Sequence, residues 1–359
     1  MKIFRWVGLL LLSALAVLLA AGCTVSDSKT GKTAAEPGTL TMMTWNVQNL
    51  FDGMDNGFEY KEFLNSAGWS AEKYKGRVNT ISAAVGGIKP SPDIIMFQEI
   101  ESLVILQDIA EALPGGYVYS RFAKNPGAAL GVGILSRFPL VETKTHSITI
   151  GRDTTPRPVL ETRVQAKKEF VVFVCHWKSK LGGDSTENTR KASARVILRR
   201  IRELWEEEPD IGVIVAGDLN ENHNEFYRRS SRAVCALLPD DPYSAQIAGG
   251  IQKDFIVLGK DKPPAPVNFP HGTVVLFSAW ARDVEKGSYY YKNEWETIDH
   301  FLVSGQFFNN SGWSFEKAVP ADFSPFANEY GIPVPYNIRT GAGLSDHLPL
   351  LLTLRMKTD

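Results

Sequence analysis

The sequence predicts one mixed α/β domain that extends over residues 40–356. Short apolar runs alternate with amphipathic segments along this region, and no internal repeat with a period of roughly 20–50 residues interrupts them. The two clearest amphipathic segments are each followed by a Pro-containing turn and then by an apolar run. That order is expected where helices cover the outer face of a sheet.

Strands are predicted where runs rich in Val, Ile, Phe and Thr are bounded by Gly, Pro or Asp. They cover residues 40–46, 93–98, 131–135, 160–164, 170–176, 212–217 and 298–303. Helices are predicted over residues 71–86 and 189–205, because apolar side chains recur there every three or four residues.

The charge balance excludes a protein that coats nucleic acid through its total charge. The 359 residues include 39 Lys and Arg against 40 Asp and Glu, so a phosphate-rich substrate must be held locally. The three cysteines form no CxxC pair, which excludes a disulfide framework and a thiolate zinc cluster.

The N-terminal region has the pattern of an export signal. Lys2 and Arg5 precede an apolar run at residues 6–21, which is shorter than the roughly 20 residues that span a membrane. The run ends in small residues before Cys23 and resembles a bacterial lipoprotein signal, although Ala20 stands where that family prefers Leu. The resemblance implies a signal peptide at residues 1–22, lipidation of Cys23 and a cell-envelope location. A plain secretory signal is the first alternative, and a retained membrane anchor is the second.

Residues 23–39 are small and polar and predict a flexible tether, so ordered structure should begin near Leu40. Beyond it, unusual polar side chains follow the apolar runs. Such strand ends could gather their side chains at one edge of the core. The residues concerned are Asn46, Glu99, His176, Asp218, Asn220, Asp299, Asp346 and His347.

These side chains favour a metal-assisted hydrolase. Glu99, Asp346 and Asn46 offer carboxylate and amide oxygens, which suit Mg²⁺, with Mn²⁺ or Ca²⁺ as alternatives, better than zinc or copper. Asp299 can hold one tautomer of His347 or His176, which would then act as a base or a hydrogen-bond donor. No Ser or Cys nucleophile is evident, and hydrolysis by water at phosphorus follows. GxGxxG, GxxxxGK[ST], GxSxG and HExxH motifs are absent from the sequence.

Seven short strings, in their expected order, resemble the endonuclease/exonuclease/phosphatase superfamily, whose fold is that of deoxyribonuclease I. The resemblance covers nearly all of the chain from Leu40 to Leu354 and implies a four-layer α/β/β/α sandwich with two packed mixed sheets. The strings are TWNVQNLF (44–51), PDIIMFQE (92–99), GVGILSRFP (131–139), HWKSK (176–180), GDLNE (217–221), IDH (298–300) and SDHLP (345–349).

The resemblance also implies roles for individual residues. Asn46 and Glu99 are expected as metal ligands, with Asp346 near or on the ion. Asp218 and Asn220 are similar to the pair that orients the attacking water. Asp299 with His347, and His176 as a second histidine, complete the implied catalytic set.

Four basic residues near the predicted site could contact phosphate. Arg157 lies where many relatives carry a phosphate-contacting Arg, and Lys178 follows the His176 string; Lys180 and Arg190 are further candidates. His300 is expected to be a packed histidine rather than a ligand. Tyr289, Tyr290, Tyr291 and Trp295 are expected mainly to pack a hairpin.

The sequence leaves the substrate open. Gln48 stands where abasic-site repair endonucleases carry Asp, which weakens a repair role. The favoured hypothesis is a cell-envelope nuclease or related phosphodiesterase that acts on nucleic acid and needs no protein partner. A sphingomyelinase-like phospholipid phosphodiesterase is the alternative, because the aromatic segment 323–336 could form a hydrophobic lip. A surface lipoprotein that only binds a ligand is disfavoured, since no expected catalytic residue is replaced.

Overall fold

The protein was analysed as a computed structural model that describes residues 38–155, 157–229, 234–248, 254–264, 269, 272–281, 284–309 and 311–357. The predicted signal peptide, Cys23 and nearly all of the predicted tether lie outside these residues. Within them, no helix is both long enough and apolar enough to cross a membrane.

The first sheet has six strands in the order β17-β18-β1-β2-β4-β3. Its centre is β1, which pairs parallel with β2 and antiparallel with β18. The parallel pairing places the carboxyl ends of β1 and β2 at the same edge of the sheet. The strands are β1 (Thr39–Leu50), β2 (Ile94–Ile100), β3 (Tyr119–Ala123), β4 (Gly131–Ser136), β17 (Gly312–Pro320) and β18 (Leu350–Lys357).

The second sheet has eight strands in the order β11-β12-β13-β16-β10-β9-β8-β5. Its central strand β10 pairs parallel with β9 and antiparallel with β16. The strands are β5 (Leu140–His146), β8 (Val159–Val164), β9 (Phe170–His176), β10 (Gly212–Asp218), β11 (Leu237–Pro239), β12 (Ile256–Gly259), β13 (Val275–Ser278) and β16 (Asp299–Val303).

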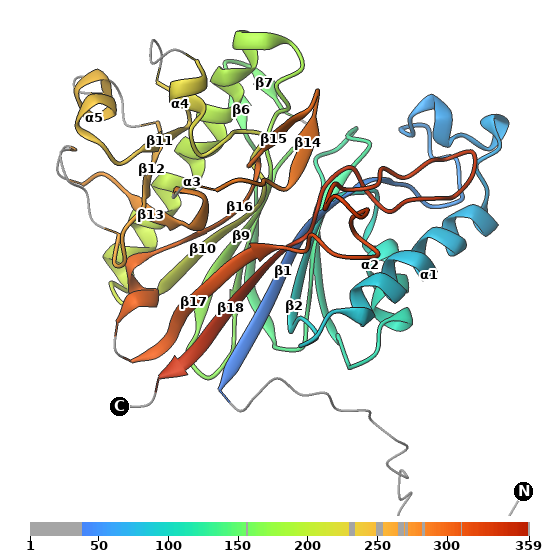
Figure 1. Cartoon of the computed structure of the whole chain (residues 1–359), viewed down its shortest axis with the longest axis horizontal. Helices are drawn as coiled ribbons and strands as arrows, with labels where there is room; N and C mark the ends of the chain where they lie inside the picture. The colour runs from blue at the N-terminus through green and yellow to red at the C-terminus, as the bar shows by residue number, and fades with distance from the viewer. Residues whose placement is uncertain are drawn as a thin grey trace, which may run out of the picture. The chain divides into compact units, whose positions relative to one another are not determined.

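Helices lie on the outer faces of both sheets (Figure 1). Helices α1 (Ala71–Gly87) and α2 (Leu103–Ala112) share an apolar core with the outward side chains of β1 and β2. Helix α3 (Glu187–Glu207) shares another with β9 and β10. A third core of inward side chains, such as Met42, Ile94, Val172 and Ile214, lies between the sheets. The predicted four-layer α/β/β/α sandwich is confirmed.

Shorter elements decorate this sandwich. The hairpin β14–β15 extends beyond the carboxyl ends of the long strands, at the top of Figure 1. The remaining elements are β6 (Thr149–Ile150), β7 (Asp153–Thr154), β14 (Tyr289–Tyr291), β15 (Glu294–Glu296), α4 (Glu225–Arg228), α5 (Pro242–Ala248) and the 3-10 helices η1 (Lys61–Phe63), η2 (Asn65–Ala67), η3 (Gly183–Thr186), η4 (Ala279–Ala281) and η5 (Gly305–Phe308).

The strands and helices expected from the sequence are all present, within a few residues of their predicted ends. The structure adds elements that the sequence analysis did not predict, chiefly α2, β5, β17 and β18. Strands β17 and β18 extend the first sheet on the side of β1 that is opposite to β2.

Candidate active site

The predicted site residues lie at neighbouring strand ends of both sheets. In the second sheet, Asp218 at the end of β10 pairs in register with His176 of β9 on one side and with Asp299 of β16 on the other. In the first sheet, Asn46 of β1 pairs in register with Gln98, the residue before Glu99. The two sheets meet through a hydrogen bond of 3.0 Å from Asn46 Nδ2 to Asp218 Oδ2.

Asp218 is the carboxylate at the centre of this arrangement. The Nε2 atoms of His176 and His347 lie 3.5 and 4.0 Å from its Oδ2. Its Oδ1 accepts the backbone N–H of Asn220 at 2.8 Å. Burial and the nearby charge of Asp299 raise the pKa of Asp218 to about 7. The group can therefore exchange a proton near neutral pH.

Asp299 pairs with His347 rather than with His176. His347 Nδ1 donates to Asp299 Oδ2 at 2.8 Å, and both side chains are buried. Burial disfavours the charged imidazolium, but the charge and the hydrogen bond of Asp299 outweigh it and raise the pKa of His347. His347 is therefore cationic at neutral pH and directs Nε2 toward Asp218.

His176 has the opposite character. Its burial and the positive charges of Arg157, His347 and Lys178 lower its pKa. Its Nε2 also lies 3.6 Å from Glu99 Oε1. The two histidines beside Asp218 thus differ in protonation at neutral pH, one neutral and one charged, and they are suited to different proton-transfer roles.

The oxygen atoms on the first-sheet side fit a hard divalent cation. Glu99 Oε2 accepts Asn49 N–H at 2.8 Å, while its Oε1 faces His176. Asn46 Oδ1 accepts the N–H of Gln48 at 3.0 Å. Among the described residues, no donor bonds to the carboxylate of half-buried Asp346. Carboxylate and amide oxygens without thiolates are the donors that Mg²⁺, Mn²⁺ and Ca²⁺ prefer.

Asp218, Asp299 and His347 also place ligand atoms within 4.8 Å of one another. We do not regard them as a ligand set, because the imidazole is already bonded to Asp299 and its protonated form has no free lone pair for a metal. Asp299 and His347 are better described as a hydrogen-bonded pair beside the place for a metal.

Unusual backbone conformations coincide with these strand ends. Gln48, Asn49, Glu99 and Asn220 have φ values of 55°, 57°, 63° and 50°, in the left-handed region that non-glycine residues seldom adopt. Gly217 has a φ of 132°, and a Cβ there would overlap the Cys175 carbonyl oxygen. Such conformations cost free energy and persist only where the surrounding contacts hold them, and they are concentrated at functional sites.

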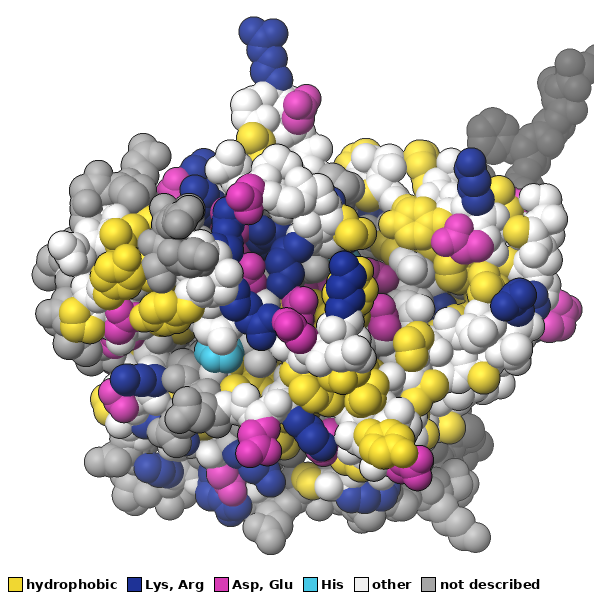
Figure 2. Space-filling view, turned by 45° about the horizontal axis from the view of Figure 1, so that its top comes forward, with side chains coloured by type: hydrophobic (Ala, Val, Ile, Leu, Met, Phe, Trp, Pro, Cys, Tyr) yellow, Lys and Arg dark blue, Asp and Glu magenta, His cyan; other side chains and the backbone are white. Residues whose placement is uncertain are grey.

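Two of the four predicted phosphate contacts remain available for that role. Arg157 donates to the Trp177 carbonyl and lies near enough to His176 and Asp218 to change the pKa of both. Burial and the charges of Arg157 and Arg190 lower the pKa of Lys178. Figure 2, which turns the hairpin end forward, shows Lys and Arg side chains near the middle of the face with acidic side chains among them.

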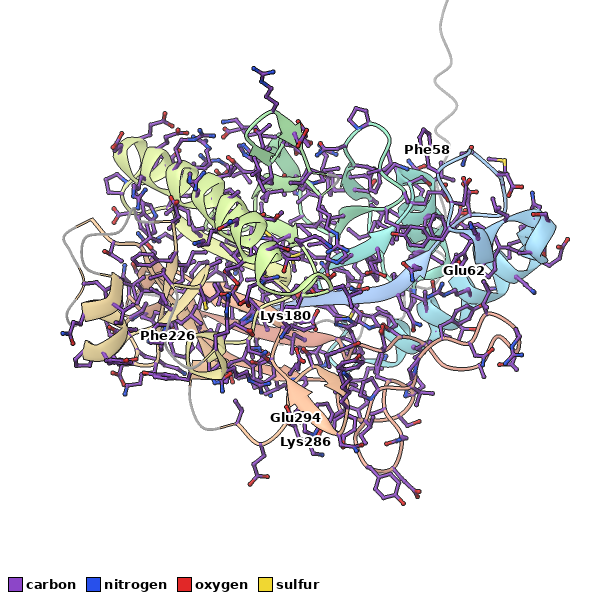
Figure 3. The ribbon with its side chains drawn as sticks, turned by 90° about the horizontal axis from the view of Figure 1, so that it is seen from above. Phe58, Glu62, Lys180, Phe226, Lys286 and Glu294 are labelled. Atoms are coloured by element: carbon purple, nitrogen blue, oxygen red, sulfur yellow. The ribbon has the colours of Figure 1, made fainter. Side chains whose placement is uncertain are left out.

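The structure pairs the other two predicted phosphate contacts, Arg190 and Lys180, with acidic side chains. Arg190 is 2% exposed and is bonded to Glu187 and Glu221, so it anchors α3 to the segment after β10. Lys180 contacts Glu296 at 2.5 Å and Glu225 at 3.3 Å. Figure 3 labels Lys180 and, on the hairpin, Glu294, which is two residues before Glu296. Acidic side chains that are buried or partly buried pair with both cations, and a linear sequence does not reveal these pairings.

Several residues organise the site through contacts that the sequence analysis did not predict. Ser288, before β14, donates to Asp299 Oδ2 at 2.6 Å. Gln48 Oε1 accepts the N–H groups of Asp346 and Tyr336, which ties the loop before β18 to the end of β1. Arg77 of α1 donates to the carbonyl groups of three successive residues, 47–49. A pattern of polar residues at strand ends could not indicate these long-range contacts.

The aromatic and histidine predictions have mixed outcomes. His300 is packed as predicted: Nε2 contacts the Glu221 carbonyl at 2.9 Å, and burial lowers its pKa to about 4. Tyr290 packs on Trp295 within the hairpin. Tyr289 instead lies with its ring 4.6 Å from that of His347, so the hairpin forms one wall of the site.

The comparisons with known proteins agree with this architecture. The model of the Endonuclease/Exonuclease/phosphatase family matches residues 41–236. No curated protein sequence matches the chain.

Three solved structures show the same fold. An endonuclease/exonuclease/phosphatase from Beutenbergia cavernae is 16% identical, with a TM-score of 0.51 over 89% of this chain and 72% of that one. The human nocturnin catalytic domain is 14% identical, with a TM-score of 0.50 over 89% and 94% of the two chains. TDP2 from Caenorhabditis elegans is also 14% identical, with a TM-score of 0.50 over 89% and 75%. The family model matches more than half of the length of this chain. The chain therefore belongs to the endonuclease/exonuclease/phosphatase family.

Proposed function

We propose that this protein is a divalent-metal-dependent phosphodiesterase in which water attacks phosphorus directly. The observation that carries the proposal is Asp218, a buried carboxylate with a pKa of about 7 between a neutral His176 and a cationic His347. The family description names endonucleases, exonucleases and phosphatases, all of which break phosphoester bonds.

Each side chain can be given a part in that reaction. Asp218 and Asn220 orient the attacking water, and Asp218 accepts its proton. His347, held by Asp299, donates to the phosphate oxygen that gains charge, while Arg157 and Lys178 hold the remaining oxygens.

The metal would be held by Glu99, Asp346 and Asn46. When bound, it would supply positive charge for the phosphate and for the leaving oxygen. The structure fits this set because its donors are oxygens and the Asp346 carboxylate is not bonded by any donor among the described residues.

A nuclease is the form of this activity that we favour. Arg157 and Lys178 place two cations near His176, where they can contact a nucleic-acid backbone locally although the whole chain carries a net charge of −1. The test is a panel of plasmid DNA, RNA and bis-p-nitrophenyl phosphate with Mg²⁺ or Mn²⁺, repeated in EDTA. Cleavage that needs the metal and disappears in His347→Ala supports the proposal. A folded, metal-bound protein that cleaves none of the three contradicts it.

One observation favours a phospholipid substrate as the second candidate. In the segment 323–336, Phe323, Tyr330 and Val334 are 46%, 69% and 37% exposed, and this segment leads into Asp346 and His347. Phosphocholine release from sphingomyelin vesicles, compared with DNA cleavage by the same preparation, distinguishes the two substrates.

We also propose that the protein is exported and anchored to the cell envelope through a lipid on Cys23, as its signal pattern indicates. The measurement is incorporation of an alkyne-labelled fatty acid in cells. Label that is present in the wild type and lost in Cys23→Ala supports lipidation, whereas equal release of both proteins into the medium supports a plain secretory signal.

A further inference from the structure

Ser288 contacts the Asp299–His347 pair although it carries no chemistry of its own in the proposed reaction. Its side chain is fully buried, and its Oγ donates to Asp299 Oδ2 at 2.6 Å. The same Oγ accepts the backbone N–H of Asp299 at 3.3 Å. A hydroxyl has one hydrogen to donate, and the Asp299 N–H occupies a lone pair of the Ser288 oxygen. The single hydroxyl hydrogen is therefore free to point at the Asp299 carboxylate.

Both donors to the Asp299 side chain meet the same oxygen. Oδ2 accepts from Ser288 Oγ and from His347 Nδ1, whereas the buried Oδ1 has no hydrogen-bond partner in the part of the chain that the structure describes. A buried polar atom without a partner destabilises the fold, so the surroundings must hold the carboxylate in this asymmetric arrangement. With Ser288 removed, the carboxylate could rotate and offer either oxygen to the imidazole.

The backbone of Ser288 is also joined to the segment that carries His347. The Ser288 carbonyl accepts Leu348 N–H at 2.7 Å, and Tyr289 forms a β-bridge with His347. Ser288 N–H in turn donates to the Glu296 carbonyl at 3.0 Å, which closes the hairpin. One residue therefore fixes the distance between the β16 acid and the histidine near the start of β18.

We propose that Ser288 is a positioning residue, which holds Asp299 in the rotamer that presents His347 Nε2 to the reacting phosphate. The inference rests on the proposed phosphoesterase function for its effect on rate, but the hydrogen-bonded arrangement can be tested without turnover. Groups that orient a catalytic or metal-bound histidine in this way typically change activity by about 10–100-fold when removed.

The kinetic test compares Ser288→Ala and Ser288→Cys with a matched control. Cys keeps a side chain of the same branching but is a weak donor, so both variants, assayed at a temperature at which they remain folded, should lower kcat on bis-p-nitrophenyl phosphate by about 10-fold or more with KM nearly unchanged. Ser278→Ala is the control, because Ser278 in β13 is equally buried and its Oγ bonds to none of the described residues. Its kcat should equal that of the wild type.

A double substitution separates positioning from a general structural effect. In an Asp299→Ala background, Ser288→Ala should cause no further loss of kcat, because its only route of action has been removed. An equal loss in both backgrounds overturns the proposal, and so does a wild-type kcat in Ser288→Ala.

A spectroscopic measurement keeps the test independent of activity. The His347 Nδ1 proton, bound to a carboxylate and shielded from water, should give a far-downfield proton NMR signal that Asp299→Ala abolishes. Ser288→Ala should shift or broaden it, whereas Ser278→Ala should not, and an unchanged signal overturns the positioning role. If the wild type cleaves no phosphoester, the proposed function fails, while this signal still decides whether Ser288 orders the pair.

Discussion

Asp218 shows how one residue can serve the proposed chemistry at a cost in stability. Burial and Asp299 raise its pKa from 3.8 to about 7, so the folded state holds a proton that the unfolded chain has released across that range. The folded state binds more protons, and this group's contribution to stability is therefore lost as the pH rises from about 4 to 7. Ionised Asp218 is needed to accept a proton from water, so activity should rise over the upper part of the same range.

Asp218→Asn should consequently abolish turnover and raise Tm in EDTA at pH 8. Asn cannot ionise, so the variant avoids burying a charge there. The gain should shrink toward pH 4, where the wild-type carboxyl is protonated in the folded state and the unfolded chain is close to the ordinary pKa of 3.8. Calorimetry at the two pH values checks the sign. A variant less stable than the wild type at pH 8 contradicts this account of the site.

Lys178 and Lys180 offer a comparison of two neighbouring cations with different tasks. Lys178 is proposed to hold a phosphate oxygen, whereas Lys180 is bonded to Glu225 and Glu296. Lys178→Ala should raise KM by about tenfold, which corresponds to about 1.4 kcal/mol, with little change in Tm. Lys180→Ala should instead lower Tm and leave KM close to the wild-type value. If Lys180→Ala raised KM and Lys178→Ala lowered Tm, Lys180 would be the phosphate contact and Lys178 the structural cation.

Helices and strands position the side chains of the site. The contact between α1 and the end of β1 is the clearest case. Arg77 is buried, donates to three carbonyl groups in residues 47–49, and lies 3.9 Å from the centre of the Tyr336 ring. Burial lowers its pKa to about 10, so it remains charged at neutral pH. Its planar guanidinium holds a left-handed backbone segment that strand pairing does not support.

Arg77→Lys should therefore weaken both the fold and the metal site. An ammonium group cannot donate to three diverging carbonyl groups in this geometry, and we expect a loss of roughly 2–3 kcal/mol and a Tm lower by several degrees. Asn49 and Gln48 carry the contacts to Glu99 and Asp346, so Mn²⁺ affinity should fall as well. Thermal unfolding and titration with Mn²⁺ measure the two effects. Lys73→Arg, on the same helix but exposed, is the control.

The sequence predicted elements well where one periodicity prevailed and poorly elsewhere. Strands β9 and β10 read as continuous apolar runs because both of their faces are buried, and α3 has an apolar side chain every three or four residues. Strand β5 is mostly exposed and polar, so its composition did not indicate a strand. Helix α2 begins with the apolar run Leu103–Leu106, which hides its helical period.

At the scale of the whole molecule, the two-sheet arrangement followed from family resemblance and not from periodicity. Local patterns define strands, but they do not say which strands pair, and the contacts from Asn46 to Asp218 and from Gln48 to Asp346 join residues far apart in the chain. The same limit explains why Lys180 and Arg190 were assigned to phosphate. Their acidic partners lie on segments that only the fold brings near.

Metal removal tests the junction between the sheets. Glu99 comes from the first sheet and Asp218 from the second, and both carboxylates approach His176 within 3.6 Å. A bound cation would offset the repulsion among these acids and Asp346, and a ligand that binds only the folded state stabilises it in proportion to the logarithm of its concentration. Tm should therefore rise with Mg²⁺ or Mn²⁺ above its value in EDTA. The increase should disappear in Glu99→Gln and persist in Glu316→Gln, an exposed acid of β17. An equal increase in both variants would show that the cation acts by screening the surface, because only a specific site depends on Glu99.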